Sequence, residues 1–339
     1  MTIQHFILTR FNLLLWNKDK EGHKVRSKEW LEHRFALFER YCLPSIKSQT
    51  CQEFEWIVLI DSTTPERFKE RIAEYQRECK QLIPVYVEPE RGRYFSEIFR
   101  EQVAKRILAV QEFKGLRVQD YQELENSKIL APENSELSTD SKLSTLNSTL
   151  KVLTTYLDND DALNVGFVED IQKRAAGLSD ETFINYTDGY QFFTDYNYMM
   201  RIHYPRNHFV SVVENGNPAT VKTIYGYGSH YYIEKIEGAR IENVENLPMW
   251  CEVIHEKNMG NDAYFLGAKM VREAAGFGFM VHGSLFTVQD SQDSQARMSD
   301  QRSSARFKYG AGLYLFRFLP RYIKTFFRRC KYFVFGRHW

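Results

Sequence analysis

Strand-like and helix-like segments alternate through the first half of the chain, and this alternation restricts the fold more than any other feature. Apolar segments rich in β-branched residues are separated by segments in which apolar residues recur at helical spacing. Such alternation is typical of a mostly parallel central sheet flanked by helices, so we predict an α/β fold. The predicted strands are 5–9, 54–60, 83–88 and 151–155, and the predicted helices begin after Ser27 (with Pro44 expected to kink or end that helix), at Thr64-Pro65 and after Arg93.

Three carboxylates, Asp158, Asp160 and Asp161, follow the predicted strand at 151–155 within four residues. Asn164 then provides an N-cap for a helix, so the carboxylates lie at the C-terminal end of a strand, where open α/β sheets bind ligands. Carboxylate oxygens are the ligands that Mg²⁺ and Mn²⁺ prefer. The stretch therefore predicts a site for a divalent metal and a diphosphate. The other interpretation is a solvated acidic turn that caps the helix.

The character of the sequence changes after this helix. Aromatic-rich strand candidates follow one another closely, which favours an antiparallel or mixed sheet in the C-terminal half. Asp188-Gly189 and Asn215-Gly216 are turn signals, residues 226–230 are expected to open a helix, and residues 247–255 form another short ordered segment. The predicted strands of this half are 182–186, 189–193, 197–204, 208–214 and 222–227.

The last 36 residues, 304–339, contain nine Lys and Arg residues interleaved with aromatic residues, and no Asp or Glu. A basic, aromatic, amphipathic tail of this kind is typical of segments that lie on anionic lipid. The other interpretation is a C-terminal helix that packs its rings on the core. A polar linker precedes the tail at 291–303.

Composition restricts the partners and the compartment. The net charge is +1, which gives no indication of a nucleic-acid partner. The five cysteines are odd in number and show no metal-binding spacing, which favours reduced thiols in a cytoplasmic protein. We find no signal peptide and no apolar run long enough to span a membrane. We therefore expect a cytoplasmic protein, peripheral on the cytoplasmic face of the membrane.

Several motifs resemble known glycosyltransferases. Residues 44–50, 54–61 and 157–161 resemble the nucleotide-sugar half of family 2-like enzymes. The bacterial rhamnosyltransferase family is the more specific resemblance, and it extends over residues 3–290, with Tyr156 where the family usually has arginine. The residues that carry it are Thr9-Arg10-Phe11-Asn12, Trp30-Leu31 with Arg34, and Ile254-His255 with Asn258.

The resemblance implies a GT-A-like, or Rossmann-like, fold in a single domain over residues 1–290. Residues 1–163 would form the nucleotide-sugar-binding half, with a loop insertion at about 114–149, and residues 164–290 the acceptor half. The family's metal motif corresponds to Asp158 and Asp160, with Asp160 preferred as the direct ligand. The other implied donor-site residues are Arg10 and Asn12 at the start of the donor pocket, Asp61 at the base or ribose, Asp158, and Asp161 beside the metal or the donor sugar.

A glycosyl transfer also needs a base that takes the proton of the acceptor hydroxyl. We predict Glu252, placed at the start of a late helix, with Asp188 and Asp262 as the next candidates. His255 is a candidate ligand of the metal or contact of the diphosphate. A surface acid and a structural histidine are the alternative interpretations of Glu252 and His255.

The sequence and the resemblance thus predict an inverting, metal-dependent glycosyltransferase. It would move a sugar, with rhamnose as the candidate that the family name suggests, from a nucleotide-diphosphate donor to a hydroxyl of a cell-surface polysaccharide or lipid-linked oligosaccharide precursor. One alternative is another nucleotide-sugar enzyme, such as a nucleotidyltransferase. Such an enzyme is expected to have a Gly-rich phosphate loop after the first strand, and Arg10-Phe11-Asn12 is not one. The second alternative is a membrane-surface binding module without catalysis, which would not bind nucleotides in a metal-dependent way.

Overall fold

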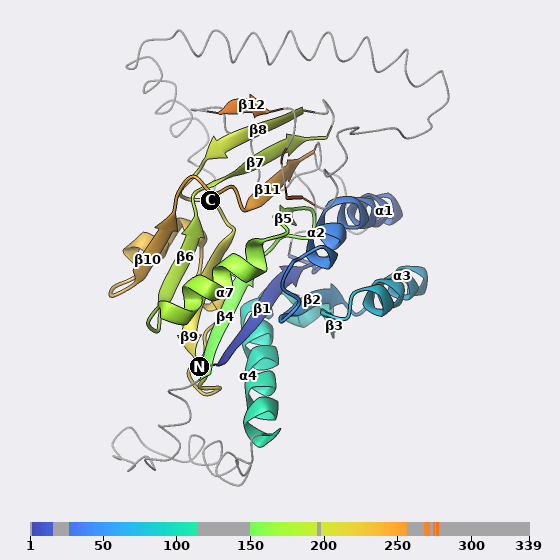
Figure 1. Ribbon diagram of the computed structural model, residues 1–339. Coiled ribbons are helices and arrows are strands. Elements are labelled where there is room, and N and C mark those ends of the chain that lie inside the picture. Colours follow the sequence, from blue (N-terminus) through green and yellow to red (C-terminus); the bar gives the residue numbers. More distant parts are fainter. Residues whose placement is uncertain are drawn as a thin grey trace.

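The computed structural model describes residues 2–15, 27–113, 150–194, 198–255, 268–271, 274 and 276–277. In this part of the chain, two sheets lie one beyond the other, and the larger one carries the N-terminus at its far end (Figure 1). The predictions for the insertion at 114–149, for the linker at 291–303, for the tail at 304–339 and for Asn258 and Asp262 lie outside the described residues. No helix of the described segments is both long and apolar enough to cross a membrane.

The larger sheet has seven described strands in the order β10-β6-β9-β4-β1-β2-β3. β1 pairs in parallel with both β2 and β4, and β2 pairs in parallel with β3, which confirms the predicted mostly parallel N-terminal sheet. β9 runs antiparallel to β4 and β6 and makes the sheet mixed. The strands are β1 (Thr2–Arg10), β2 (Glu55–Asp61), β3 (Leu82–Val87), β4 (Leu150–Tyr156), β6 (Thr182–Tyr186), β9 (Val210–Asn215) and β10 (Arg240–Val244).

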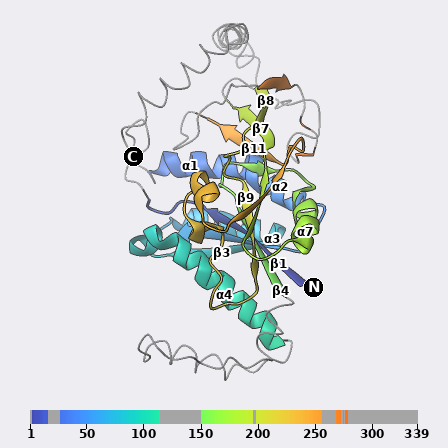
Figure 2. The ribbon, with the colours of Figure 1, turned by 90° about the vertical axis from the view of Figure 1, so that its left-hand side faces the viewer.

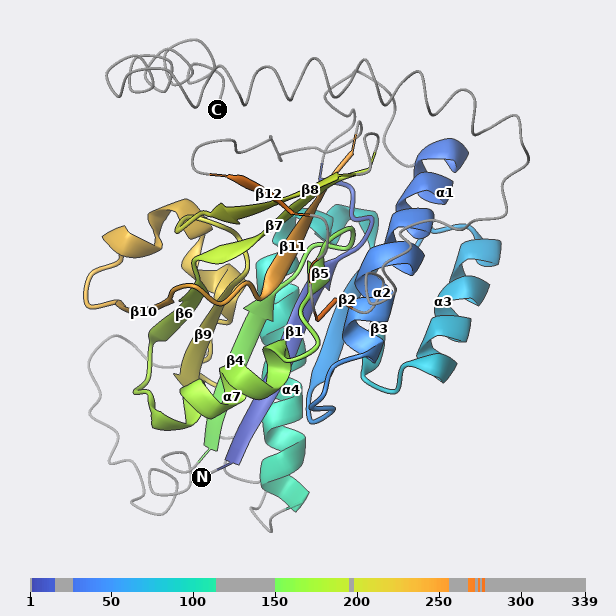
Figure 3. The same ribbon diagram turned by 45° about the horizontal axis from the view of Figure 1, so that its top comes forward.

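Helices cover both faces of this sheet, because apolar side chains of its central strands alternate between the faces. Trp56, Val58 and Ile60 of β2 pack in one cluster with α1, α3 and α7, whereas Ile57 and Leu59 pack with α4 in another. Figures 2 and 3 show the sheet between α4 and α7. The helices are α1 (Lys28–Leu37), α2 (Leu43–Lys47), α3 (Glu66–Glu78), α4 (Phe95–Phe113) and α7 (Phe167–Gly177).

The smaller sheet has five described strands in the order β12-β8-β7-β11-β5. Its first strand, β5, follows β4 of the large sheet after only five residues, so the acidic turn at 157–161 joins the two sheets. The mixed pairing in this half agrees with the sequence prediction. The strands are β5 (Ala162–Leu163), β7 (Asp188–Phe193), β8 (Tyr198–His203), β11 (Trp250–Ile254) and β12 (Lys269–Val271).

Most helix starts lie within a few residues of their predicted positions. Ser27 is the N-cap of α1, and its hydroxyl accepts a hydrogen bond from the Trp30 N–H at 3.2 Å, as predicted. Pro44 does not end the first helix. A π-helical segment, η1 (Phe38–Cys42), leads directly into α2, with Pro44 in its first turn, where a missing N–H is tolerated. The Asn164 side chain accepts from the Gly166 N–H, and Gly166 is the N-cap of α7.

Several expectations for the C-terminal half differ from the structure. Residues 222–227 form no strand, because the end of the segment is a 3₁₀ helix, η3 (Ile224–Tyr227). Asp188-Gly189 is not a turn but the start of β7. The helix that residues 226–230 were expected to open begins at His230 and is a short 3₁₀ helix, η4 (His230–Lys235). The glycine at 189 serves close packing instead, since a Cβ there would lie 2.2 Å from Cδ2 of Trp250.

We expect Gly189→Ala to destabilise the protein by about 1–3 kcal/mol, because the added methyl group has no room beside the buried Trp250 indole. Urea unfolding of the variant measures the loss. Gly177→Ala is the matched control, since a Cβ at the end of α7 meets nothing within 4 Å. Equal stabilities of the two variants would contradict the packing argument.

Candidate active site

The acidic turn lies where four strands of the large sheet bring their ends together. β1, β2 and β4 are parallel, so their C-terminal residues meet at one edge (Figure 3). β9 is antiparallel to β4, so the residues just before β9 reach the same edge. This topology brings His208 to the acidic turn, although 47 residues separate it from Asp161.

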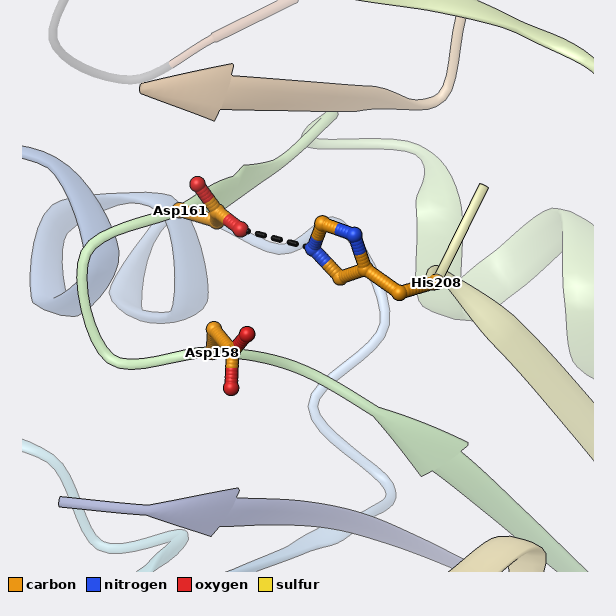
Figure 4. A group of neighbouring side chains, drawn as sticks. All are labelled: Asp158, Asp161 and His208. Carbon is orange, nitrogen blue, oxygen red and sulfur yellow. Dashed lines mark hydrogen bonds and ion pairs between the residues drawn. The ribbon is translucent and has the colours of Figure 1, made fainter. Parts of the chain in front are cut away.

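In the described part of the chain, Asp158, Asp161 and His208 form a compact group of side chains of the types that ligate metals in proteins. Their ligand atoms all lie within 4.8 Å of one another (Figure 4). His208 Nε2 donates to Asp161 Oδ2 at 2.8 Å, and the N–H of Val253 donates to the other oxygen at 2.8 Å. Two carboxylates and one imidazole are a donor set that suits a divalent cation such as Mn²⁺.

The His208–Asp161 contact also determines the charge of the imidazole. Burial opposes protonation of His208, but the hydrogen bond and the charge of Asp161 outweigh burial and raise the pKa of the imidazole to about 9. Burial also raises the pKa of the Asp161 carboxyl, so the two side chains share one proton along the hydrogen bond between Nε2 and Oδ2. A cation that takes His208 as a ligand has to displace this proton.

Asp160 points to different partners. Its Oδ2 atom accepts from Arg34 Nη1 at 2.6 Å and from His255 Nε2 at 2.9 Å. Burial alone would raise the pKa of Asp160, but Arg34 and His255 lower it below the ordinary value. The structure thus brings Asp160 and His255 together, and it places the Arg34 guanidinium of α1 against the same carboxylate. Their direct role as metal ligands stays a prediction.

Arg10 lies on the opposite side of the turn, within a group of aromatic rings. Its guanidinium lies 4.8 to 5.5 Å from the ring centroids of Phe95, Tyr156 and Tyr225, and its Nη2 atom is 3.5 Å from Asp158 Oδ1. The Tyr156 hydroxyl donates to the Asp158 carboxylate at 3.0 Å. Arg10 Nη2 also donates to the Tyr156 hydroxyl, so Tyr156 connects Arg10 with Asp158.

Asn12 and Asp61 stabilise the loops at this edge. The Asn12 amide donates to the Thr64 hydroxyl at 2.8 Å, and its oxygen accepts from the Asp61 N–H at 3.0 Å. The buried Asp61 carboxylate accepts from the N–H of Thr63 at 2.9 Å. Both side chains thus fix the ends of β1 and β2, and their predicted contacts with a donor nucleotide stay predictions.

Glu252 and Asp188, the two described candidates for the base, differ in their surroundings. Glu252 lies on strand β11, so its predicted place at the start of a helix was wrong. It is buried, it accepts from Gln191 at 2.5 Å, and burial raises its pKa. Asp188 accepts from the N–H of Asn246 at 2.9 Å, and such hydrogen bonds outweigh burial and lower its pKa. Glu252 is therefore better suited to take a proton.

Sequence reasoning assigned no role to three residues of this site. His208 was only part of a predicted strand, and the antiparallel direction of β9 is what brings it to the turn. Arg34 was named only as one of the residues that carry the family resemblance. Its spacing of four residues from Trp30, which places both on one face of a helix, could have indicated a shared role. Tyr225 lay in a segment predicted as a strand, which is 3₁₀-helical.

Comparison with known families gives one match. The model of a family described as putative rhamnosyl transferase matches residues 4–115. The matched segment contains β1 to β3 and α1 to α4, and therefore Arg10, Arg34 and Asp61. This match confirms the predicted family resemblance over these residues. Among curated proteins, none matches this chain.

Among solved structures, this chain is similar to crystal structures of S. aureus TarS. For TarS residues 1–349 in complex with UDP, the sequence identity is 9% and the TM-score is 0.34, with 75% of this chain and 61% of that chain covered. For a second crystal structure of TarS residues 1–349, the sequence identity is 10% and the TM-score is 0.32, with 75% of this chain and 60% of that chain covered. The chain thus spans about three fifths of the length of these two structures.

Proposed function

We propose, from the resemblance of residues 4–115 to the rhamnosyl transferase family, that this protein is a glycosyltransferase of the GT-A type. It transfers a sugar, with rhamnose as the first candidate, from a nucleoside-diphosphate donor to an acceptor hydroxyl with inversion. The acceptor is a cell-surface polysaccharide or a lipid-linked oligosaccharide precursor. We also propose a cytoplasmic location, with the basic tail at 304–339 on the anionic face of the membrane.

The observation that carries this proposal is the group Asp158, Asp161 and His208 at the C-terminal edge of the parallel strands. Its two carboxylates and one imidazole fit a divalent cation, and Asp158 and Asp161 supply the oxygen ligands that Mn²⁺ and Mg²⁺ prefer. These three residues would hold the metal. When bound, the cation neutralises the charge that develops on the leaving diphosphate.

Arg10 and the aromatic rings around it lie beside this group and suit the diphosphate of the donor. Arg10 offers a positive charge 3.5 Å from Asp158, in the right place for a phosphate oxygen. Phe95, Tyr156 and Tyr225 surround the guanidinium and hold it in place beside Asp158. Tyr156 and Tyr225 are mostly buried, so these rings also help to exclude water from the anomeric carbon.

Glu252 is our candidate for the base. Its carboxylate is buried on β11, close enough to His208 and Asp160 for their charges to act on its pKa. The Gln191 amide holds one of its oxygens, which leaves the other to accept the proton of the acceptor hydroxyl. The base then takes this proton while the hydroxyl oxygen bonds to the anomeric carbon and the nucleoside diphosphate leaves.

Calorimetric titration of the full chain with UDP, GDP and dTDP, with and without Mn²⁺, tests the proposal. We expect one nucleotide to bind, with an affinity at least about tenfold higher in the presence of Mn²⁺, because metal and diphosphate share the acidic turn. The bound nucleotide would identify the donor base. If none of the three binds in any metal condition, the acidic turn is only a structural element, and the transferase proposal is wrong.

A further inference from the structure

Arg34 and Trp30 present unused hydrogen-bond donors beside the candidate active site. Both lie on α1 four residues apart, on the same face of the helix, and they are 8% and 7% exposed. The Arg34 guanidinium lies 5.3 Å from the centre of the Trp30 ring. The two side chains therefore form one group at the N-terminal helix of the site.

Among the described residues, acceptors lie against only one edge of the Arg34 guanidinium. Nη1 donates to Asp160 at 2.6 Å and lies 3.5 Å from the Asn159 side-chain oxygen. Nε of Arg34 and Nε1 of the Trp30 indole are buried, and neither atom has an acceptor among the described residues. A buried donor without an acceptor is costly and rare in native proteins, so a ligand that accepts from these atoms would stabilise the site.

The unoccupied edge has a specific chemistry. Nε and Nη2 of a guanidinium point in parallel and bind the two oxygens of a carboxylate or phosphate in a bidentate way. Asp160 holds the guanidinium from the Nη1 side and fixes its plane, so the arrangement is preorganised. The Trp30 indole N–H beside it supplies a further donor.

We propose that Arg34 and Trp30 form a binding site for an oxyanion of the substrate, either a carboxylate or a phosphate. This inference rests on the proposed transferase function. The site lies on the Asp160 side of the acidic turn, where His255, the residue after β11, contacts Asp160, whereas Arg10 and its rings lie on the Asp158 side. An anion on the acceptor, such as the carboxylate of an acidic sugar, fits this position, and the donor diphosphate is the second source.

Nuclear magnetic resonance of the wild-type chain tests the site directly. We expect inorganic phosphate and acetate to shift the Trp30 indole N–H and Arg34 Nε–H signals, the former assigned with Trp30→Phe. Addition of the nucleotide that binds in calorimetry separates the sources. If it shifts the same two signals, the donor supplies the oxyanion, and if phosphate still shifts them in the nucleotide complex, the acceptor does.

Variants measure the strength of the site. Arg34→Lys keeps the charge but loses the fork, so we expect phosphate to bind about tenfold more weakly, the equivalent of one charge-assisted hydrogen bond. Arg71→Lys is the matched control, because Arg71 pairs with Glu32 and Glu39 on the far side of α1. The proposal is overturned if neither anion moves the two signals of the wild type, or if Arg34→Lys binds phosphate as the wild type does.

These outcomes are distinct from failure of the transferase proposal. The anion titrations use the free protein and need no nucleotide. A chain that binds no nucleotide but shows the phosphate shifts would retain the oxyanion site and lose the proposed donor site. A chain that binds a nucleotide with Mn²⁺ but shows no phosphate shifts would retain the transferase proposal alone.

Discussion

Replacing Asp158 by asparagine is expected to lower the affinity for the nucleotide in the presence of Mn²⁺ by about 10- to 100-fold. Most of the gain in affinity that Mn²⁺ gives the wild type would then be lost. Loss of a group that merely supports a metal ligand already has an effect of this size. Asp158 is one of the three residues whose ligand atoms lie within 4.8 Å of one another, and its carboxylate also lies 3.5 Å from Arg10 Nη2. Calorimetry of the variant with the nucleotide that binds the wild type measures the loss.

Two further variants make this result specific. Asp180→Asn is the matched control, because Asp180 is exposed and its described hydrogen bonds, from Glu181 and Asn215, lie outside the acidic turn. Asp160→Asn tests the preference inferred from the family resemblance. If the Mn²⁺ dependence disappears in Asp160→Asn and persists in Asp158→Asn, then Asp160 is the metal ligand. The group Asp158, Asp161 and His208 would then not be the metal site.

Replacing Glu252 by glutamine is expected to reduce the turnover number for sugar transfer by about 10²- to 10⁴-fold, the usual contribution of a general base. Nucleotide affinity should stay within about twofold, since Glu252 is not part of the proposed donor or metal site. The measurement is a transfer assay with the identified donor, together with calorimetry on the same preparation. Glu78→Gln, at the exposed end of α3, is the control.

The pH dependence gives a second view of the same residue. Burial raises the pKa of Glu252, and a base has to be deprotonated, so kcat/KM is expected to rise with pH through a value above the ordinary glutamate range. The rising limb should disappear in Glu252→Gln. If the limb persists, or if Asp188→Asn abolishes turnover while Glu252→Gln does not, then Asp188 or another group is the base.

The parts of the fold that depend on local periodicity could be predicted from the sequence. β1 to β4 and the helices between them each show their own strand or helix pattern, and the structure has them within a few residues of the predicted positions. The pairing in the C-terminal half could be predicted only as antiparallel or mixed. The direction of β9 and the division into two sheets depend on contacts between distant segments, which the pattern of one segment does not contain.

The same distinction applies to the site. The acidic turn and its place after a strand could be read from the sequence, because the strand, the carboxylates and the helix are consecutive. His208 could not, since it lies near Asp161 only through the antiparallel pairing of β9 with β4. Glu252 was named as the base but placed on a helix, because the segment 247–255 is too short for periodicity to separate a buried strand from a helix.

The π-helical segment Phe38–Cys42 also has a consequence for how this site can vary. It is the junction between α1, which carries Arg34, and α2, whose Ser45 accepts from the N–H of Leu163 just after the acidic turn. The wider turn of the segment sets the rotational phase between these two helices. A deletion of one residue within this segment would therefore rotate Ser45 away from the acidic turn while Arg34 stayed in place.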